Sequence, residues 1–305
     1  MLAAPQTPLK NPSESGTLRR AMTKIDTFES LFKAADKPVY EYRPLQLERA
    51  LVVTDLSNPA AAALLDSVRN FLSVLGEEVE WLPLGGADFA SVGALLERVA
   101  EASPDLIVSY RHLHSNAWQW PHGLGEHLDV LTQATDIPVL VLPHPEAGRA
   151  LPHASVNTNR VMAITDHLTA DARLVDYALR FTAAAGRCWL THIESQHHFD
   201  RFLEAVEKTP EIETEDVRQL LESQLLKQPS DYIDSCRRAI EARGSPVEIE
   251  AIVAMGDRVA EYRRLIEGHR VDLLVLNTLD GDRLAMHGQA YPLAVELRSI
   301  PLLLL

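Results

Sequence analysis

The sequence predicts an α/β protein built from two tandem, doubly wound parallel-sheet domains that are related by internal duplication. First, apolar runs of strand length alternate with helical patterns along most of the chain, as expected for parallel strands joined by helices. Second, residues 300–305 (Ile-Pro-Leu-Leu-Leu-Leu) resemble residues 137–142 (Ile-Pro-Val-Leu-Val-Leu), and each copy has a glycine, Gly288 or Gly125, thirteen residues before its proline. Such a repeat indicates a duplicated unit.

The strand-like runs divide the chain into three parts. Residues 1–45 form a polar tail with a short helix near 26–32, residues 46–148 a shortened first domain, and residues 156–305 a second domain. Expected strands lie near 50–54, 79–84, 106–110 and 139–142 in the first domain, and near 161–165, 188–194, 247–255, 273–277 and 302–305 in the second. The first domain therefore lacks one strand-helix unit. The proline in Gln228-Pro229-Ser230 predicts two successive helices between residues 213 and 243.

Composition limits the possible partners. The formal net charge of -14 disfavours binding to nucleic acid, because no basic run offsets it. The sequence contains no apolar run of about 18 residues that could span a membrane and no signal-peptide pattern, so a cytoplasmic protein is expected. Cys188 and Cys236 have neither the number nor the spacing of a disulfide framework or zinc site, and we interpret both as packing residues.

Several matched positions resemble the universal stress protein family in its tandem two-domain form. In each half a hydrophobic strand is followed by Thr-Asp, at Thr54-Asp55 and Thr165-Asp166, and a later aspartate, Asp105 or Asp272, begins another strand. Residues 255–257 (Met-Gly-Asp) are similar to the family's Gly-Asp at a strand end. The resemblance implies a Rossmann-like, adenine nucleotide alpha hydrolase-like fold and a possible ATP site.

The ATP motif implied by the resemblance is degenerate here. ATP-binding members follow the late strand with Gly-x-x-Gly, about nine residues and then Gly-Ser or Gly-Thr, whose amides and hydroxyls hold phosphates. The first domain has Ser109 to Leu113 without glycine and ends with Gly125-Glu126, so it is not expected to bind ATP in the family's manner. In the second domain the resemblance implies a ligand site that consists of Asp166, Gly256, Asn277, Gly281, Gly288 and Gln289.

Other polar residues have simpler alternatives. Asp55 and Asp166 could contact an adenine edge, but aspartate between a strand and a helix is also a common turn or capping residue. His112, His114 and His122 could together bind a metal ion, although in a chain with twelve histidines some are expected to cluster by chance. The same residues could sense protons, but no other feature of the sequence supports that role. Residues 123–125 (Gly-Leu-Gly) lack the third glycine of a dinucleotide loop, and Trp118 and Trp120 are expected to pack on the domain.

These observations favour a regulatory or scaffold protein of the universal stress protein type, without catalysis, that acts in a stress response through ligand or protein binding. The alternative is an ATP-binding switch or slow ATPase that uses the second domain, although no general base can be named. Residues 302–305 are expected to pair with residues 139–142 across a pseudo-two-fold axis, because an open apolar edge would invite aggregation. We therefore expect a protein partner or self-association.

Overall fold

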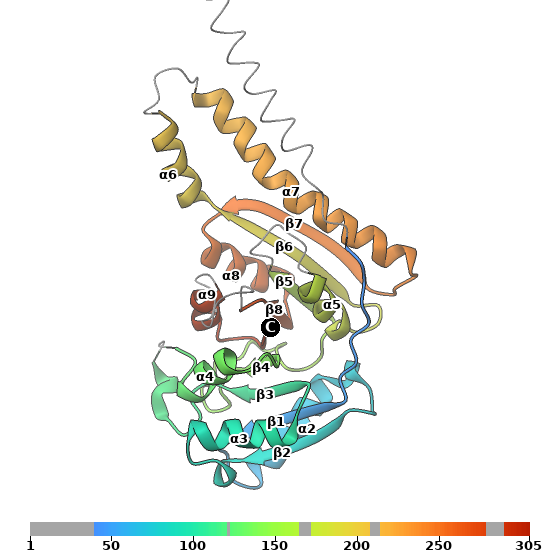
Figure 1. Cartoon of the computed structure of the whole chain (residues 1–305), viewed down its shortest axis with the longest axis vertical. Helices are drawn as coiled ribbons and strands as arrows, with labels where there is room; N and C mark the ends of the chain where they lie inside the picture. Colours follow the sequence, from blue (N-terminus) through green and yellow to red (C-terminus); the bar gives the residue numbers. More distant parts are fainter. Residues whose placement is uncertain (1–39, 121–122, 165–171, 208–213, 279–289) are drawn as a thin grey trace, which may run out of the picture.

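Nine strands form a single, mostly parallel sheet in the computed structural model, which describes residues 40–120, 123–164, 172–207, 214–278 and 290–305 (Figure 1). The strand order is β2-β1-β3-β4-β9-β8-β5-β6-β7, and every neighbouring pair is parallel except β4 with β9. The prediction of an α/β protein with parallel strands is therefore confirmed.

The described part of the first half contains four strands: β1 (Arg49–Thr54), β2 (Glu80–Gly85), β3 (Leu106–Tyr110) and β4 (Val139–Leu142). Its helices are α2 (Ala60–Phe71), α3 (Val92–Ala102) and α4 (Glu126–Ala134), with short 3-10 helices η1 (Ser73–Leu75), η2 (Gly86–Asp88) and η3 (Asn116–Gln119). Every residue of β3 and β4 is buried, as is typical of parallel strands that are covered on both faces.

The described part of the second half contains five strands: β5 (Arg160–Ile164), β6 (Arg187–Ser195), β7 (Glu248–Gly256), β8 (Leu273–Leu276) and β9 (Leu302–Leu304). Its helices are α5 (Ala172–Phe181), α6 (Gln196–Glu207), α7 (Thr214–Ala242), α8 (Arg258–His269) and α9 (Ala290–Glu296). All nine strands lie within a residue or two of their expected positions, and the first half has one strand fewer, as predicted.

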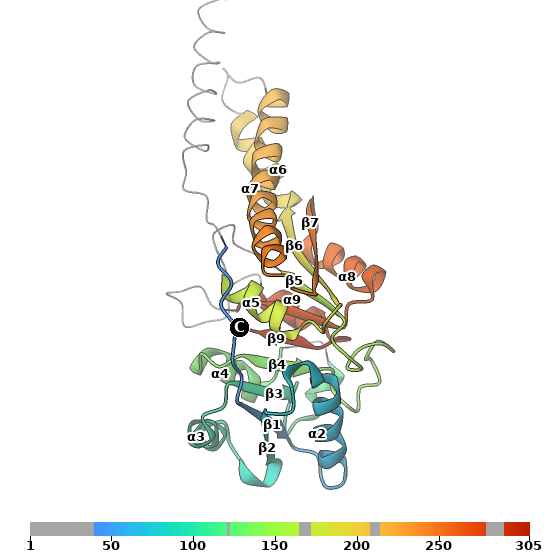
Figure 2. The same cartoon turned by 90° about the vertical axis from the view of Figure 1, so that its right-hand side faces the viewer.

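Helices cover both faces of the sheet. Figure 2 shows α2 and α3 on opposite faces in the first half, and α7 and α8 on opposite faces in the second. Side-chain caps fix the start of two of these helices, because Ser91 Oγ accepts a hydrogen bond from the N–H of Ala94 in α3, and Asp257 Oδ1 accepts one from Ala260 in α8. The buried faces of these helices complete the core on either side of the strands.

The two halves join through their last strands. β4 and β9 pair antiparallel, with Val139 opposite Leu304, Leu140 opposite Leu303 and Val141 opposite Leu302. All residues of both strands are buried. The expected pairing of residues 139–142 with the end of the chain is thus confirmed, and neither strand is left as an open edge.

Outward from this joint, the strand order of one half mirrors that of the other. β4, β3, β1 and β2 correspond in position to β9, β8, β5 and β6, and β7 is the additional strand. Two aspartates make the same contact: Asp105 Oδ2 accepts from the N–H of Arg49 at the start of β1, and Asp272 Oδ2 accepts from that of Arg160 at the start of β5, each at 2.9 Å. One continuous sheet contains both halves, and the expected domain boundaries at 46–148 and 156–305 stay predictions.

The prediction of two helices between residues 213 and 243 is wrong. α7 runs through Pro229 without a break, and the proline ring is buried. Ser230 Oγ donates to the carbonyl of Leu226 at 2.7 Å, and the helix packs along β7. A proline costs about 3 kcal/mol inside a helix, and burial against a sheet can offset that loss. The helix expected near residues 26–32 lies outside the described residues.

Candidate functional site

Two points of the sheet are candidate ligand sites because the strand order reverses there. In the first half, the chain leaves β1 to β2 on one side and later returns to β3 on the other, and in the second half β5 lies between β6 and β8 in the same way. Ligands of open α/β sheets bind beyond the carboxyl ends of the strands at such points. The two crevices lie beyond Thr54 and Tyr110 in the first half, and beyond Ile164 and Leu276 in the second.

In the first half, Asp55 is bonded to groups of its own chain. Its carboxylate accepts a hydrogen bond from the Tyr110 hydroxyl, and its Oδ2 accepts one from the main-chain N–H of His114 at 2.7 Å. The same hydroxyl accepts from the N–H of Asp55 at 3.1 Å and lies 2.9 Å from Thr54 Oγ1. Burial, followed by the bond to Asp55, raises the pKa of Tyr110, so this phenol stays protonated. These contacts favour the structural interpretation of Asp55 over the adenine-binding one.

Aromatic side chains fill the space beside Asp55. A Cβ atom added to Gly86 would lie 2.9 Å from the Asp55 Cα and 2.9 Å from Cε1 of His114, so only glycine fits there. The His114 ring packs edge-on against Phe89 with centroids 4.9 Å apart, and lies 5.5 Å from the ring of His127. The loop after β3 therefore occupies the position beyond β1 and β2 with its own side chain.

The loop takes this path because of two unusual backbone positions. His112 and His114 both have left-handed φ angles, +61° and +55°. A Cβ atom on Gly125 would lie 2.8 Å from the Cα of His112, so this glycine lets the start of α4 approach the loop closely. The sequence resemblance matched Gly125 with a phosphate-binding glycine. In the structure, Gly125 instead allows the loop to pack closely against the start of α4.

Arg111 is a buried residue of this crevice that sequence reasoning missed. Its side chain is 3 % exposed, and its Nη2 donates to the carbonyl of Leu297 in the second half at 3.1 Å. Its Nε and Nη1 have no hydrogen-bond partner among the described residues. Burial, and then the nearby Arg298, lower the pKa of Arg111 to about 9. An arginine directly after an apolar strand was the signal in the sequence.

The histidines do not converge on a metal site within the described residues, where no three His, Cys, Asp or Glu side chains are placed to hold an ion. His122 lies outside the described residues, so the set His112, His114 and His122 stays untested. Burial lowers the pKa of His112, His127 and His144, which makes these rings neutral near pH 7.

The two tryptophans of this region behave differently. Trp118 stacks on the ring of His144 with centroids 4.8 Å apart and an interplanar angle of 18°, which agrees with the packing expected for it. Trp120 is 62 % exposed, so the expectation that it packs on the domain is wrong. Arg298 Nη1 in the second half donates to the main-chain carbonyl of Trp120 at 3.5 Å.

In the second half, the structure describes only two residues of the expected ligand site. Gly256 ends β7 opposite Ser195, and Asn277 directly follows β8. β5 and β6 separate these strands by about 14 Å, and Gly256 lies three residues further along its strand than the level of Asn277, so the two residues are about 17 Å apart and do not form one contact point. The other expected site residues, Asp166, Gly281, Gly288 and Gln289, lie outside the described residues.

A carboxylate cluster that the sequence did not indicate lies near Gly256. Glu194 at the end of β6 accepts from the N–H of Ser195 at 3.0 Å and lies 3.3 Å from Nε2 of His192 and 3.5 Å from Nη2 of Arg258. The hydrogen bond with His192 is the main cause that lowers the pKa of Glu194, which is therefore ionised at pH 7. A second carboxylate, that of Glu261, lies close to Gly256, where an added Cβ would be 2.8 Å from its Cγ. Arg258 pairs with Glu194 and Arg264 pairs with Glu261, so charges of both signs at this strand end are already bonded to each other.

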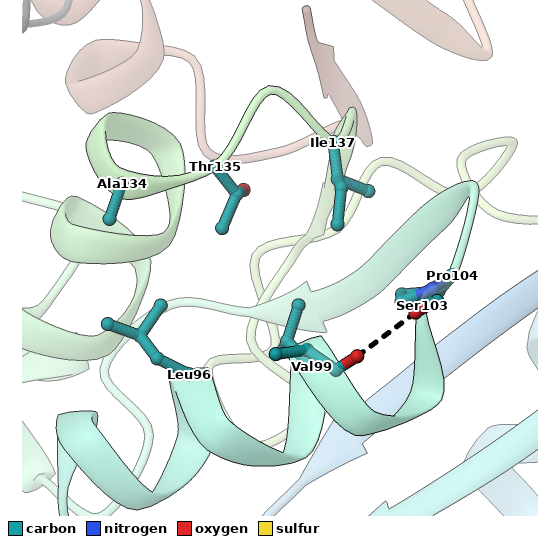
Figure 3. A pocket seen from close by; sticks show the side chains of 8 residues that line it. Leu96, Val99, Ser103, Pro104, Ala134, Thr135 and Ile137 are labelled. Atoms are coloured by element: carbon teal, nitrogen blue, oxygen red, sulfur yellow. Dashed lines mark hydrogen bonds between the residues drawn. The ribbon is translucent and has the colours of Figure 1, made fainter.

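An apolar groove lies at the opposite end of the strands. It has a volume of about 440 Å³ and lies between the C-terminal parts of α3 and α4, before β3 and β4 begin (Figure 3). It is lined by Leu96, Val99, Ala100, Ser103, Pro104, Ala134, Thr135 and Ile137. The Ser103 hydroxyl donates to the carbonyl of Ala100 at 3.0 Å, so its proton is already used within α3. The groove offers no arrangement of acid, base and nucleophile.

Comparisons with known proteins give similarity at the level of structure. No protein-family model matches the chain, and a search of curated proteins finds no match. Similar solved structures include a universal stress protein from Archaeoglobus fulgidus, with 12% identity, TM-score 0.47, and coverage of 85% of this chain and 98% of that one. A putative universal stress protein from Pseudomonas aeruginosa has 12% identity, TM-score 0.44 and coverage of 85% and 93%.

A functionally unknown protein from Pseudomonas aeruginosa is similar to the same extent, with 14% identity, TM-score 0.46, and coverage of 85% of this chain and 92% of that one. TM-scores below 0.5 are too low to assign a fold, which follows here from the strand order and register. In the described part of the chain, no helix is both long and apolar enough to cross a lipid bilayer.

Proposed function

We propose that this chain is a universal stress protein-like regulatory or scaffold protein, which acts through ligand or protein binding and not through catalysis. The proposal rests on one observation above all: Asp55, the residue that would contact a nucleotide in the first half, is bonded to Tyr110 and to the main chain of His114. Because these partners already occupy the Asp55 carboxylate, it is not free to bind a ligand.

The proposal includes an internal duplication. The mirrored strand order and the matching contacts of Asp105 and Asp272 support it, since both aspartates bind the first N–H of the corresponding strand. Under this proposal, the two copies have diverged, so that the first copy is a structural unit and any ligand binds to the second.

The second candidate is a nucleotide switch in the second half, where ATP would bind at Asp166, Asn277, Gly281, Gly288 and Gln289. It is supported by the sequence resemblance and by the position of Asn277 beside the carboxyl end of β5. At the end of β6 and β7, Arg258 pairs with the ionised Glu194, so this arginine is already bonded within the protein. Slow ATP hydrolysis would in addition need a general base, and none is placed among the described residues beside Asn277.

The test is to identify small molecules that the freshly purified protein releases on denaturation, and then to titrate the protein with ATP. Under the scaffold proposal, the released fraction contains no nucleotide and ATP leaves the melting temperature unchanged. Recovery of nearly one adenine nucleotide per chain would refute it and favour the switch. Asp166→Ala should then abolish binding, while Asp55→Ala, the matched change in the first half, should leave it intact.

A further inference from the structure

The two outer strands of the sheet, β2 and β7, differ in how well their edges are protected. Both lie at the ends of the strand order, and each pairs with one neighbour among the described strands (Figure 1). An exposed edge presents unpaired N–H and C=O groups that can pair with another strand, and native proteins commonly block it with proline or with local bonds. The hydrogen-bond register shows which residues of each strand face outward.

The edge of β2 is blocked. The N–H of Glu80 donates to Glu48 at 2.8 Å on the β1 side, so by alternation Trp81, Pro83 and Gly85 face the open edge. Pro83 has no N–H, and the N–H of Gly85 donates to Asp88 Oδ2 at 3.0 Å. Trp81 has the one outward N–H of this strand that is neither missing nor bonded to a described residue. A single free N–H cannot form the row of hydrogen bonds that pairing with another strand needs.

Among the residues that the structure describes, the edge of β7 has no such protection. The N–H of Glu248 donates to the carbonyl of Gly186 at 3.0 Å on the β6 side, so the outward positions are Ile249, Ala251, Val253 and Met255. None of them is proline, and no described strand pairs with them. The Ile249 side chain is buried, Ala251 is exposed, and Val253 and Met255 are half-buried. The strand therefore offers a nine-residue ladder with an apolar sequence from residue 251 to residue 255.

We propose that the edge of β7 binds the same edge of a second copy of this chain, so that two sheets continue into one across a two-fold axis. Pairing of one edge with itself is antiparallel, and it closes after two copies because it uses the same residues on both. In the register that we propose, Ile249 pairs with Met255 of the second copy, Ala251 pairs with Val253, and Ile252 faces Ile252.

This register is self-complementary in charge and in shape. The outward residues that exchange hydrogen bonds are all apolar, and they pair in the combinations named above. The acids of the strand do not meet, because Glu248 faces Gly256 and Glu250 faces Ala254 of the second copy. Like charges directly opposite would be destabilising, and an unrelated strand would not in general avoid them. The pattern therefore favours a second copy over a foreign peptide.

The first experiment measures the molar mass of the full chain by light scattering after size-exclusion chromatography over a concentration series. The wild type is expected to reach twice 33.9 kDa. Val253→Pro should be a monomer, because it removes an outward N–H and leaves the β6 ladder intact, as proline is tolerated on open edges. Val253→Thr keeps that N–H and the branched shape, and should still be a dimer.

A second variant covers the case in which Val253→Pro does not fold. Ala251 is already exposed, so Ala251→Lys should fold, as checked by circular dichroism, and it places a charge in the proposed interface. It should also be a monomer. A wild type that is monomeric at all concentrations leaves the edge to some other partner and overturns the proposal, as does a dimer that survives in both Val253→Pro and Ala251→Lys.

The register has its own test in cysteine cross-linking. Ile252 faces itself in a non-hydrogen-bonded pair, where the Cα atoms lie about 4.5 Å apart and a disulfide fits. Ile252→Cys should therefore give a covalent dimer under mild oxidation, whereas Ala254→Cys, which faces Glu250, should not. Both native cysteines are fully buried and serve as an unreactive background. Cross-linking through residue 254 and not through residue 252 would refute this register.

Discussion

Replacement of Leu303 by aspartate tests the joint between the halves. Leu303 is completely buried in the middle of β9, where it pairs with Leu140 of β4 on one side and Val275 of β8 on the other. Loss of a buried leucine side chain costs about 2–5 kcal/mol. An unpaired carboxylate at the same place adds about 3–5 kcal/mol. The sum, roughly 5–10 kcal/mol, is as large as the whole stability of many domains, which is about 5–15 kcal/mol.

Leu303→Asp is therefore expected to be unfolded or aggregated. The assay is circular dichroism and urea unfolding with light scattering, and Leu303→Ala should show the smaller loss of about 2–5 kcal/mol. Val156→Asp is the matched control, because Val156 is 59 % exposed and the same charge there should change stability little. A stable, soluble Leu303→Asp protein with a cooperative transition would refute the joint.

Two further predictions concern buried polar groups. Tyr110→Phe removes the hydroxyl that donates to Asp55 and should lower the free energy of unfolding by about 1–3 kcal/mol in urea; an unchanged value would show that the Asp55 contacts do not stabilise the loop. Burial is the main cause that raises the pKa of Asp272 to about 6. Between about pH 4 and 6 the folded state therefore binds more protons than the unfolded state, so the protein loses stability as pH rises through that range. Asp272→Asn should flatten this slope, and an identical pH profile of unfolding for both proteins would contradict it.

Much of the fold could be predicted because its elements are local. The strand from Leu106 to Tyr110 is a short apolar run with a turn on either side, and such runs are visible without any knowledge of their neighbours. The β4–β9 pairing was predictable because an apolar edge at residues 302–304 needs cover. The unbroken helix α7 could not be predicted in this way. A helix that runs through Pro229 depends on packing against β7, and the periodicity of the sequence does not show that packing.

The site was less predictable, because the role of a polar residue depends on which groups lie beside it. Asp55 looks like a ligand residue in the sequence, and only the structure places Tyr110 and the N–H of His114 on its carboxylate. Arg111 and Glu194 carried no motif, and Leu297 and Arg258, which contact them, lie far away in the chain. The expected residues of the second half lie mostly outside the described residues, so their grouping stays a prediction.

The two proposals meet in the second half, where their coupling can be measured. β6 alone separates β5, which borders the proposed nucleotide site, from β7, which carries the proposed dimer edge, so the two lie about 10 Å apart. If ATP binds beside β5 and changes the dimer dissociation constant by some factor, then linkage requires dimerisation to change the ATP affinity by the same factor. For a scaffold, the dimer dissociation constant is the same with and without ATP. Dimer dissociation measured at both extremes of ATP concentration therefore separates a switch from a scaffold.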